Sequence, residues 1–195
     1  HEDCRRQRQM CIRDRINLHR RNSRYHPELE LHDSIRAVSD LREVVHEADI
    51  VLLSVPSKSM DHVCSELARV IAEQTALLST TKGIHSDGFK LMSQVISERL
   101  PDHPVGVLSG PNLSREVAER HLTASVVASQ SPIVRKLTRN AFATKYFRLY
   151  SSEDLISVEL GGALKNIYAI AAGLADGLEV GQNTRALLIL SLIHI

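Results

Sequence analysis

The sequence predicts an α/β fold in which a doubly wound parallel sheet is followed by the start of an all-α second domain. Two patterns support this prediction. Residues 35–150 alternate short apolar runs with longer amphipathic stretches, which is typical of βαβ units. Residues 153–178 form one run rich in Ala, Leu, Ile and Gly with helical periodicity and no strand signal. We therefore expect a sheet domain at 16–150 and a helical domain at 151–195.

The elements of the sheet domain can be read in order along the chain. The clearest strand is the apolar run at residues 48–56, which ends at Pro56 because proline cannot donate to a strand ladder. Ser57 then starts a helix over residues 58–72, whose apolar side chains recur at helical spacing. The pattern continues with strands at 75–80, 105–109, 123–129 and 146–150, and with helices at roughly 87–99, near Leu113 and from Pro132.

Composition excludes several classes of protein. The chain has 195 residues, of which 43% are hydrophobic and 24% charged, as in an ordinary globular protein. Its net charge of +1 argues against a nucleic-acid surface, and no apolar run approaches the roughly 18 residues of a membrane span. Cys4, Cys11 and Cys64 lack metal-site spacing, as do the histidines, so we expect no metal site. Free thiols favour a reducing, cytoplasmic location.

The N-terminal stretch differs from the rest of the chain. Residues 1–24 carry eight arginines, against Glu2, Asp3 and Asp14. One interpretation is a basic arm that binds nucleic acid or targets an organelle, but the acids and the missing Ser-rich pattern disfavour it. The alternative is that residues 1–15 are spurious or disordered, since Met10 to Arg15 and the last five residues resemble translated sequencing adapters. We adopt this second interpretation.

Three loops that follow predicted strands share small or hydroxyl residues. They are Ser54-Val55-Pro56-Ser57, Thr80-Thr81-Lys82-Gly83 and Ser109-Gly110-Pro111-Asn112. The carboxyl ends of parallel strands meet at one edge of a sheet, where ligands bind. These loops offer hydroxyls, backbone N–H groups and one cation, so they could hold an anionic ligand such as a phosphate. The alternative is that these residues only form turns and that Lys82 is a solvated surface lysine.

The long helical run contains a pair of glycines ahead of a lysine. Gly161 and Gly162 each cost a helix interior about 1 kcal/mol relative to alanine. Both lie within one turn of Lys165, which therefore stands on a strip of very small side chains. This strip could form a groove beside a lone cation. The alternative is close helix packing, with Lys165 extended outward at its rim.

Taken in order, these motifs resemble the NAD(P)-dependent glycerol-3-phosphate dehydrogenases of the bacterial type. The resemblance covers residues 16–190. It is carried by Ala48 to Ser57, Thr81-Lys82-Gly83-Ile84, Leu108 to Asn112, Arg115 to Ala118, and Val158 to Asn166 followed by Ala175-Asp176-Gly177. The resemblance implies a Rossmann-like dinucleotide-binding domain. It also implies interconversion of sn-glycerol 3-phosphate and dihydroxyacetone phosphate with NAD or NADP, which supplies phospholipid synthesis.

The resemblance also implies roles for individual residues. Lys165 is the catalytic proton acceptor toward the C2 hydroxyl of the substrate, and Asn166 holds the substrate oxygen. Lys82 touches both substrate and cofactor. The resemblance further assigns Gly110 and Asn112 to the substrate loop, and Tyr25, Pro56 and Ser114 to cofactor contacts.

The sequence departs from the family pattern at both ends. No glycine precedes Gly83, so the G-x-G-x-x-G phosphate loop is absent from these residues. The family's downstream substrate-phosphate segment is absent too. We therefore expect an internal fragment that is inactive alone. Two alternatives remain: another two-domain dehydrogenase for hydroxyacids or sugar nucleotides, and an inactive nucleotide-binding fragment. The choice between NAD and NADP and the oligomeric state, including a homodimer, stay open.

Overall fold

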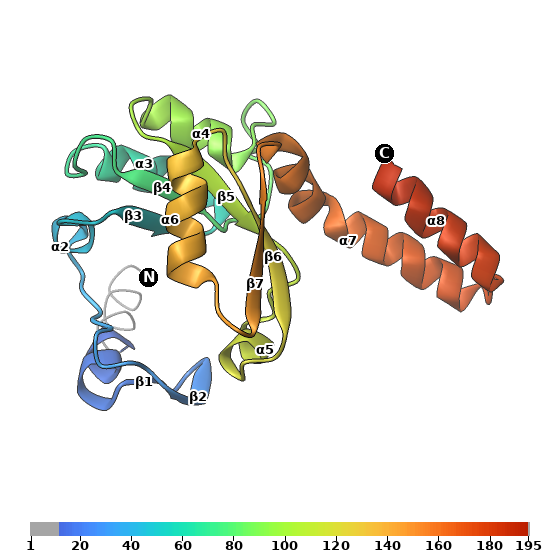
Figure 1. Cartoon of the computed structure of the whole chain (residues 1–195), viewed down its shortest axis with the longest axis horizontal. Coiled ribbons are helices and arrows are strands. Elements are labelled where there is room, and N and C mark those ends of the chain that lie inside the picture. Colours follow the sequence, from blue (N-terminus) through green and yellow to red (C-terminus); the bar gives the residue numbers. More distant parts are fainter. Residues whose placement is uncertain (1–11, 195) are drawn as a thin grey trace.

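The computed structural model describes residues 12–194. Its centre is one five-stranded sheet in the order β3-β4-β5-β6-β7, with helices on both faces (Figure 1). A two-stranded hairpin lies on one side of this body, and a pair of helices projects from the other. The strands of the main sheet are β3 (Ile50–Leu53), β4 (Ala76–Ser79), β5 (Val105–Ser109), β6 (Thr123–Ala128) and β7 (Phe147–Ser152). The α/β class predicted from the sequence is confirmed.

The direction of the last two strands differs from the prediction. Strands β3, β4 and β5 are parallel, but β6 runs antiparallel to β5, and β7 is parallel to β6. The sheet is therefore mixed, where the sequence pattern predicted a parallel one. The cause is the link between β5 and β6, whose only helix is the five-residue α5 (Ser114–Ala118). This link stays at the carboxyl end of β5, whereas a parallel pair needs a crossover to the opposite end.

Both faces of the sheet are buried, as a doubly wound fold requires. One face packs on α3 (Met60–Leu67) and α4 (Met92–Arg99) through Met60, Leu67, Met92 and Ile96. The opposite face packs on α6 (Pro132–Phe142) through Val134, Leu137 and Phe142. Strand β4 lies between these layers and is buried along its whole length. The sheet is thus a rigid support for the loops at its edges.

Two helices are shorter than their sequence patterns predict. Helix α3 follows the 3-10 turn η1 (Ser57–Ser59) and ends at Leu67, five residues before the expected end. Helix α4 begins at Met92, although the expected helix began at residue 87. Gly88 and Phe89 have φ values of 72° and 52° there, which form a turn that a helix cannot contain. The Gln94 side chain accepts a hydrogen bond from the Leu91 N–H at 2.8 Å and fixes the start of α4.

The N-terminal segment forms small elements beside the sheet. Residues 12–19 are helical, and the chain continues through β1 (Arg21–Asn22), β2 (His26–Glu30) and α2 (Leu41–Val45). Arg13 donates a hydrogen bond to Ser39 at 2.7 Å, which ties the first helix to the loop before α2. Of the stretch 1–15 that we expect to be spurious or disordered, residues 1–11 lie outside the described residues, and 12–15 belong to this helix.

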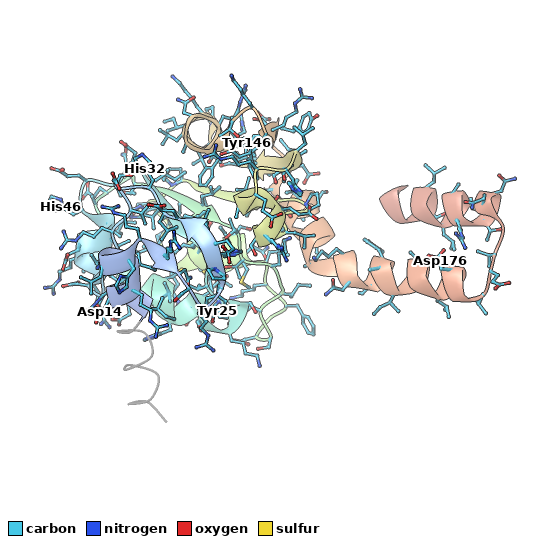
Figure 2. All side chains as sticks on the ribbon, turned by 90° about the horizontal axis from the view of Figure 1, so that it is seen from below. Asp14, Tyr25, His32, His46, Tyr146 and Asp176 are labelled. Atoms are coloured by element: carbon cyan, nitrogen blue, oxygen red, sulfur yellow. The ribbon has the colours of Figure 1, made fainter. Side chains whose placement is uncertain are left out.

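The C-terminal part consists of α7 (Leu155–Gly177) and α8 (Gln182–His194). Helix α7 leaves the sheet and runs outward, and Asp176 on it faces α8 and pairs with Arg185 at 2.9 Å (Figure 2). By length and composition alone, α7 is apolar enough to cross a membrane. The expected absence of a membrane span therefore stays a prediction. The buried residues of α7 are Glu159, beside the sheet domain, and Ala175, near α8.

Candidate functional site

A cavity of about 720 Å³ opens at the edge of the sheet where β3, β4 and β5 end. Its polar wall comes from the loops after these strands and consists of Ser54, Thr80, Lys82, Asn112 and Ser114. Its other wall is mostly apolar and includes Leu52, Leu108, Ala141, Phe142, Tyr146 and Phe147. Because β6 and β7 run in the opposite direction, the start of β7 lies at this same edge. The cavity thus has one hydrogen-bonding side and one side suited to a flat apolar group.

Lys82 is held at the cavity by the loop after β4. The Thr80 N–H donates to the Leu53 carbonyl at 3.0 Å, and the Thr81 hydroxyl donates to the Val55 carbonyl at 2.7 Å. These bonds tie the loop to the end of β3. Gly83 then turns the chain with a φ of 135°, a value that only glycine adopts easily. The Lys82 ammonium donates to the Gly110 carbonyl at 3.1 Å, so it joins the loops after β4 and β5.

The electrostatics of Lys82 also involve α7. Partial burial lowers the pKa of Lys82 below its usual value, and the positive charge of Lys165 lowers it further. Lys165 lies on α7, so its charge acts on Lys82 from a different part of the fold. An anion bound between them would relieve this repulsion. The pair is suited to a phosphorylated or otherwise anionic ligand.

The loop after β5 is held in place by contacts with β6. The buried Ser125 hydroxyl donates to the Asn112 side-chain oxygen at 2.5 Å, which sets the direction of the amide group. A Cβ atom on Gly110 would lie 2.6 Å from the Ser125 hydroxyl and 2.9 Å from the Ala124 carbonyl oxygen. Only glycine fits at this close approach. The sequence motif thus places the Gly110 carbonyl under Lys82 and the Asn112 amide in the cavity wall.

Helix α7 approaches this edge at the second residue of its Gly161-Gly162 pair. A Cβ atom on Gly162 would lie 2.7 Å from the Ser109 hydroxyl and 3.9 Å from Cγ of Lys82. Gly161 has no atom within 4 Å of its Cβ position, so close packing explains Gly162 but not Gly161. Lys165 and Asn166 follow on the next turn and are exposed. Close packing of the helix is therefore observed at Gly162 alone of this pair.

The structure brings four of the predicted site residues together: Lys82, Asn112 and Ser114 line the cavity, and the Gly110 carbonyl accepts a hydrogen bond from Lys82. Lys165 and Asn166 lie exposed on α7 and do not line this cavity. Tyr25 instead lines a neighbouring cavity of about 320 Å³ with Arg115 and Glu119, and it lies on the β1–β2 hairpin (Figure 2). Pro56 is exposed at the start of η1, where its carbonyl accepts the Ser59 N–H at 2.8 Å.

Sequence reasoning missed two buried groups beside the site. Ser125 lies on β6, and Glu159 lies on the first half of α7. Glu159 is 9% exposed and accepts hydrogen bonds from the N–H group and the hydroxyl of Ser93. Burial raises the pKa of Glu159, and the bonds from Ser93 partly oppose this rise. A lone acid within an apolar run was the available signal, because a buried acid requires hydrogen-bonding partners.

Comparison with known protein families shows which family this chain matches. The model of the NAD-dependent glycerol-3-phosphate dehydrogenase N-terminus matches residues 5–134, and that of the C-terminus matches residues 154–194. The chain belongs to the NAD-dependent glycerol-3-phosphate dehydrogenase family. The resemblance noted in the sequence is therefore confirmed, and so are the Rossmann-like sheet domain and the helical region that follows it.

Curated relatives and solved structures agree with this assignment. Proteins named glycerol-3-phosphate dehydrogenase [NAD(P)+] from Saccharophagus degradans and Alcanivorax borkumensis are 46% and 42% identical over 90% and 89% of this chain. The match covers 49% and 51% of those relatives, so the chain spans about half of their length. The structure of glycerol-3-phosphate dehydrogenase from Coxiella burnetii matches with a TM-score of 0.80 and 34% identity, over 92% of this chain and 55% of that one. The Plasmodium falciparum structure matches with a TM-score of 0.82 and 30% identity, over 90% and 50%.

A more distant match bears on the alternative of a sugar-nucleotide enzyme. The structure of GDP-mannose dehydrogenase from Pseudomonas aeruginosa matches with a TM-score of 0.54, but only 14% of the residues are identical. This likeness is one of fold alone. The two family models that match this chain favour the glycerol-3-phosphate dehydrogenases over this alternative.

Proposed function

We propose that this chain carries the catalytic centre of an oxidoreductase that interconverts sn-glycerol 3-phosphate and dihydroxyacetone phosphate with NAD or NADP. The observation that supports this most directly is the cavity lined by Lys82 and Asn112, where the Lys82 ammonium donates to the Gly110 carbonyl and the charge of Lys165 on α7 lowers the pKa of Lys82. The names of the curated relatives support the same substrate and cofactors. The product of the reducing direction would supply phospholipid synthesis.

The residues of the cavity fit the nicotinamide end of the cofactor. The apolar wall around Phe142 and Tyr146 suits a flat ring, and hydroxyls of the polar wall suit a ribose. When bound, the cofactor accepts or donates the hydride. We assign Ser114 and Lys82 to cofactor contacts from within the cavity, and Tyr25 and Pro56 to contacts from its surroundings. Because no glycine precedes Gly83, the residues present fit one end of the dinucleotide rather than its pyrophosphate.

Each polar side chain then has a role in the reaction. Oxidation of the C2 hydroxyl requires removal of a proton, and the Lys165 amine accepts it. In the reducing direction the Lys165 ammonium returns a proton to the carbonyl oxygen. Lys82 attracts the anionic substrate and steadies its oxygen, and the Asn112 and Asn166 amides orient it. The substrate also separates the two cations that otherwise repel each other.

The test of this proposal uses the chain fused in place of the corresponding half of the Saccharophagus degradans relative. We expect this chimera to reduce dihydroxyacetone phosphate with NADH or NADPH. Lys165→Ala should lower kcat by at least about 10²-fold, because proton transfer is lost. Lys82→Met should lower kcat/KM by about 10²-fold or more, because substrate orientation is lost. Lys136→Met on α6 is the matched surface control and should change neither value.

Two results would contradict these roles. An inactive wild-type chimera that folds and binds cofactor would remove the support for the activity. A kcat/KM of Lys82→Met within about threefold of wild type would make Lys82 an ordinary surface lysine, for which substitutions have small effects.

We further propose a cytoplasmic protein whose partner is a small molecule. The buried free thiol of Cys64 is consistent with a reducing compartment. A homodimer and the lack of a membrane span remain predictions, and sedimentation of the detergent-free protein tests both.

A further inference from the structure

Helix α7 makes little buried contact with the sheet domain, yet it carries Lys165. Of its 23 residues, the buried ones are Glu159 and Ala175, and Ala175 lies toward α8. Glu159 is therefore the buried side chain through which α7 meets the sheet domain. The second close contact is Gly162 against Ser109, one turn further along. Half-buried side chains such as Leu155, Val158 and Leu160 add to these two contacts, and the rest of α7 extends from this point.

Glu159 satisfies the start of another helix. Its carboxylate accepts the backbone N–H of Ser93 at 3.1 Å and also binds the Ser93 hydroxyl. Ser93 is the second residue of α4, where backbone N–H groups have no partner within the helix. A carboxylate at this end is favoured by the helix dipole as well. Glu159 thus caps α4 from a helix that lies 66 residues away in the sequence.

The latch formed by Glu159 and Ser93 shares a face of α7 with the catalytic candidates. Gly162, Lys165 and Asn166 follow Glu159 at intervals of three, six and seven residues. At about 100° of rotation per residue, these side chains fall within about 120° of the helix surface. The same face looks toward a small pocket that Glu159 and Gly162 line together with Lys82. A shift of α7 at the latch would therefore move Lys165 relative to Lys82.

We propose that Glu159 is a positioning residue whose bonds to the first turn of α4 set the place of Lys165 relative to Lys82. Its effect on catalysis rests on the proposed function, but its effect on the two lysines does not. If Glu159 only added stability, its loss would weaken the fold without changing how the two lysines interact in the folded state.

The decisive experiment measures the pKa of Lys82 by NMR in the 195-residue chain labelled with 13C-lysine. Lys165→Met should raise this pKa, because one cause of its depression is the charge of Lys165. Glu159→Ala should raise it too, since α7 can then move away. The direct effect of deleting a carboxylate would be the opposite, a lower lysine pKa, so the sign of the change separates the two explanations.

Matched variants complete the test. Glu159→Gln keeps an acceptor for the Ser93 N–H, so α7 stays in place and the Lys82 pKa should not rise, since the loss of the charge alone can only lower it. Glu153→Ala, which removes an exposed acid paired with Arg135 at the same junction, should do the same. Ser93→Ala removes only one bond of the latch and should raise the pKa slightly, and it decides the matter if Glu159→Ala does not fold. An unchanged or lowered Lys82 pKa in folded Glu159→Ala, or an unchanged value in Ser93→Ala, would overturn the proposal.

The chimera adds a catalytic readout. Displacement of a catalytic group by about 1 Å can lower a rate by about 10²-fold, so Glu159→Ala should reduce kcat/KM on this scale while Glu159→Gln restores it to within about threefold. If the wild-type chimera has no activity, the proposed function fails while the NMR result still decides the role of Glu159. Wild-type kcat/KM in Glu159→Ala would contradict the positioning role.

Discussion

Replacement of Gly162 by alanine tests how closely α7 approaches the sheet. Alanine is better than glycine in a helix interior by about 1 kcal/mol, so an unobstructed position would gain that stability. At Gly162, however, the new methyl group would lie 2.7 Å from the Ser109 hydroxyl. The Ser109 hydroxyl is the end of a rotatable side chain, so relieving the contact costs a rotamer change of about 0.5 to 1.5 kcal/mol. We therefore expect Gly162→Ala to be about 0.5 to 1.5 kcal/mol less stable than Gly161→Ala, whose methyl group meets no atom within 4 Å.

The assay is urea unfolding of the 195-residue chain followed by circular dichroism at fixed temperature and pH. Gly161→Ala is the control, since it makes the same chemical change one residue earlier on the same helix. The double variant Ser109→Ala with Gly162→Ala should recover stability, because the next atom of Ser109 is 3.8 Å away. Equal stabilisation by Gly161→Ala and Gly162→Ala would show that α7 does not lie against Ser109.

Three further expectations follow from buried groups. Ser125→Ala removes the hydrogen-bond donor to Asn112, so KM for dihydroxyacetone phosphate in the chimera should rise about tenfold. The control is Ser129→Ala, which loses a hydrogen bond to the Val105 carbonyl and should lower stability while leaving KM unchanged. Burial raises the pKa of Cys64 to about 11, so native Cys64 should react with iodoacetamide at pH 8 at least about tenfold more slowly than in urea, and equal rates would contradict its burial. Because burial raises the pKa of Glu159, the folded state holds its proton longer than the unfolded state, and its contribution to stability is lost as pH rises through the folded pKa. Glu159→Gln should therefore gain stability relative to wild type from pH 4.5 to 7 in urea titrations, and a constant difference would count against this linkage.

The strand pattern could be predicted from the sequence, but strand direction could not. The prediction at residues 105–109 coincides with β5, and the buried β4 differs from its predicted range by one residue at each end. The antiparallel direction of β6 could not be predicted, because the apolar pattern of a strand is the same whichever way the strand runs. Helix α3 ends before its apolar pattern does, since Val70 and Ile71 pack on the core from turns rather than from a helix. An apolar pattern in the sequence indicates which side chains are buried. It does not show whether the backbone at those residues is a helix or a turn.

Some residues of the candidate site could likewise be predicted from the sequence, and others could not. Lys82 and Asn112 could be predicted because they follow strands whose carboxyl ends meet at one edge, whereas Ser114 was expected only from the family resemblance. Ser125 and Glu159 could not, because their partners are distant in the sequence: 13 residues separate Ser125 from Asn112, and 66 separate Glu159 from Ser93. The position of Lys165 beside Lys82 depends on how α7 docks, which no local pattern records.

The reversed direction of β6 and β7 has a consequence for the evolution of specificity. It gives the cavity two walls, a polar one from the loops after β3, β4 and β5 and an apolar one to which the end of α6 and the start of β7 contribute beside Leu52 and Leu108. Substitutions at Phe142 or Tyr146 can reshape the apolar wall without touching the hydrogen bonds that hold Lys82 and Asn112. Preference for the flat ring of a ligand and preference for its anionic group can therefore drift independently in this fold.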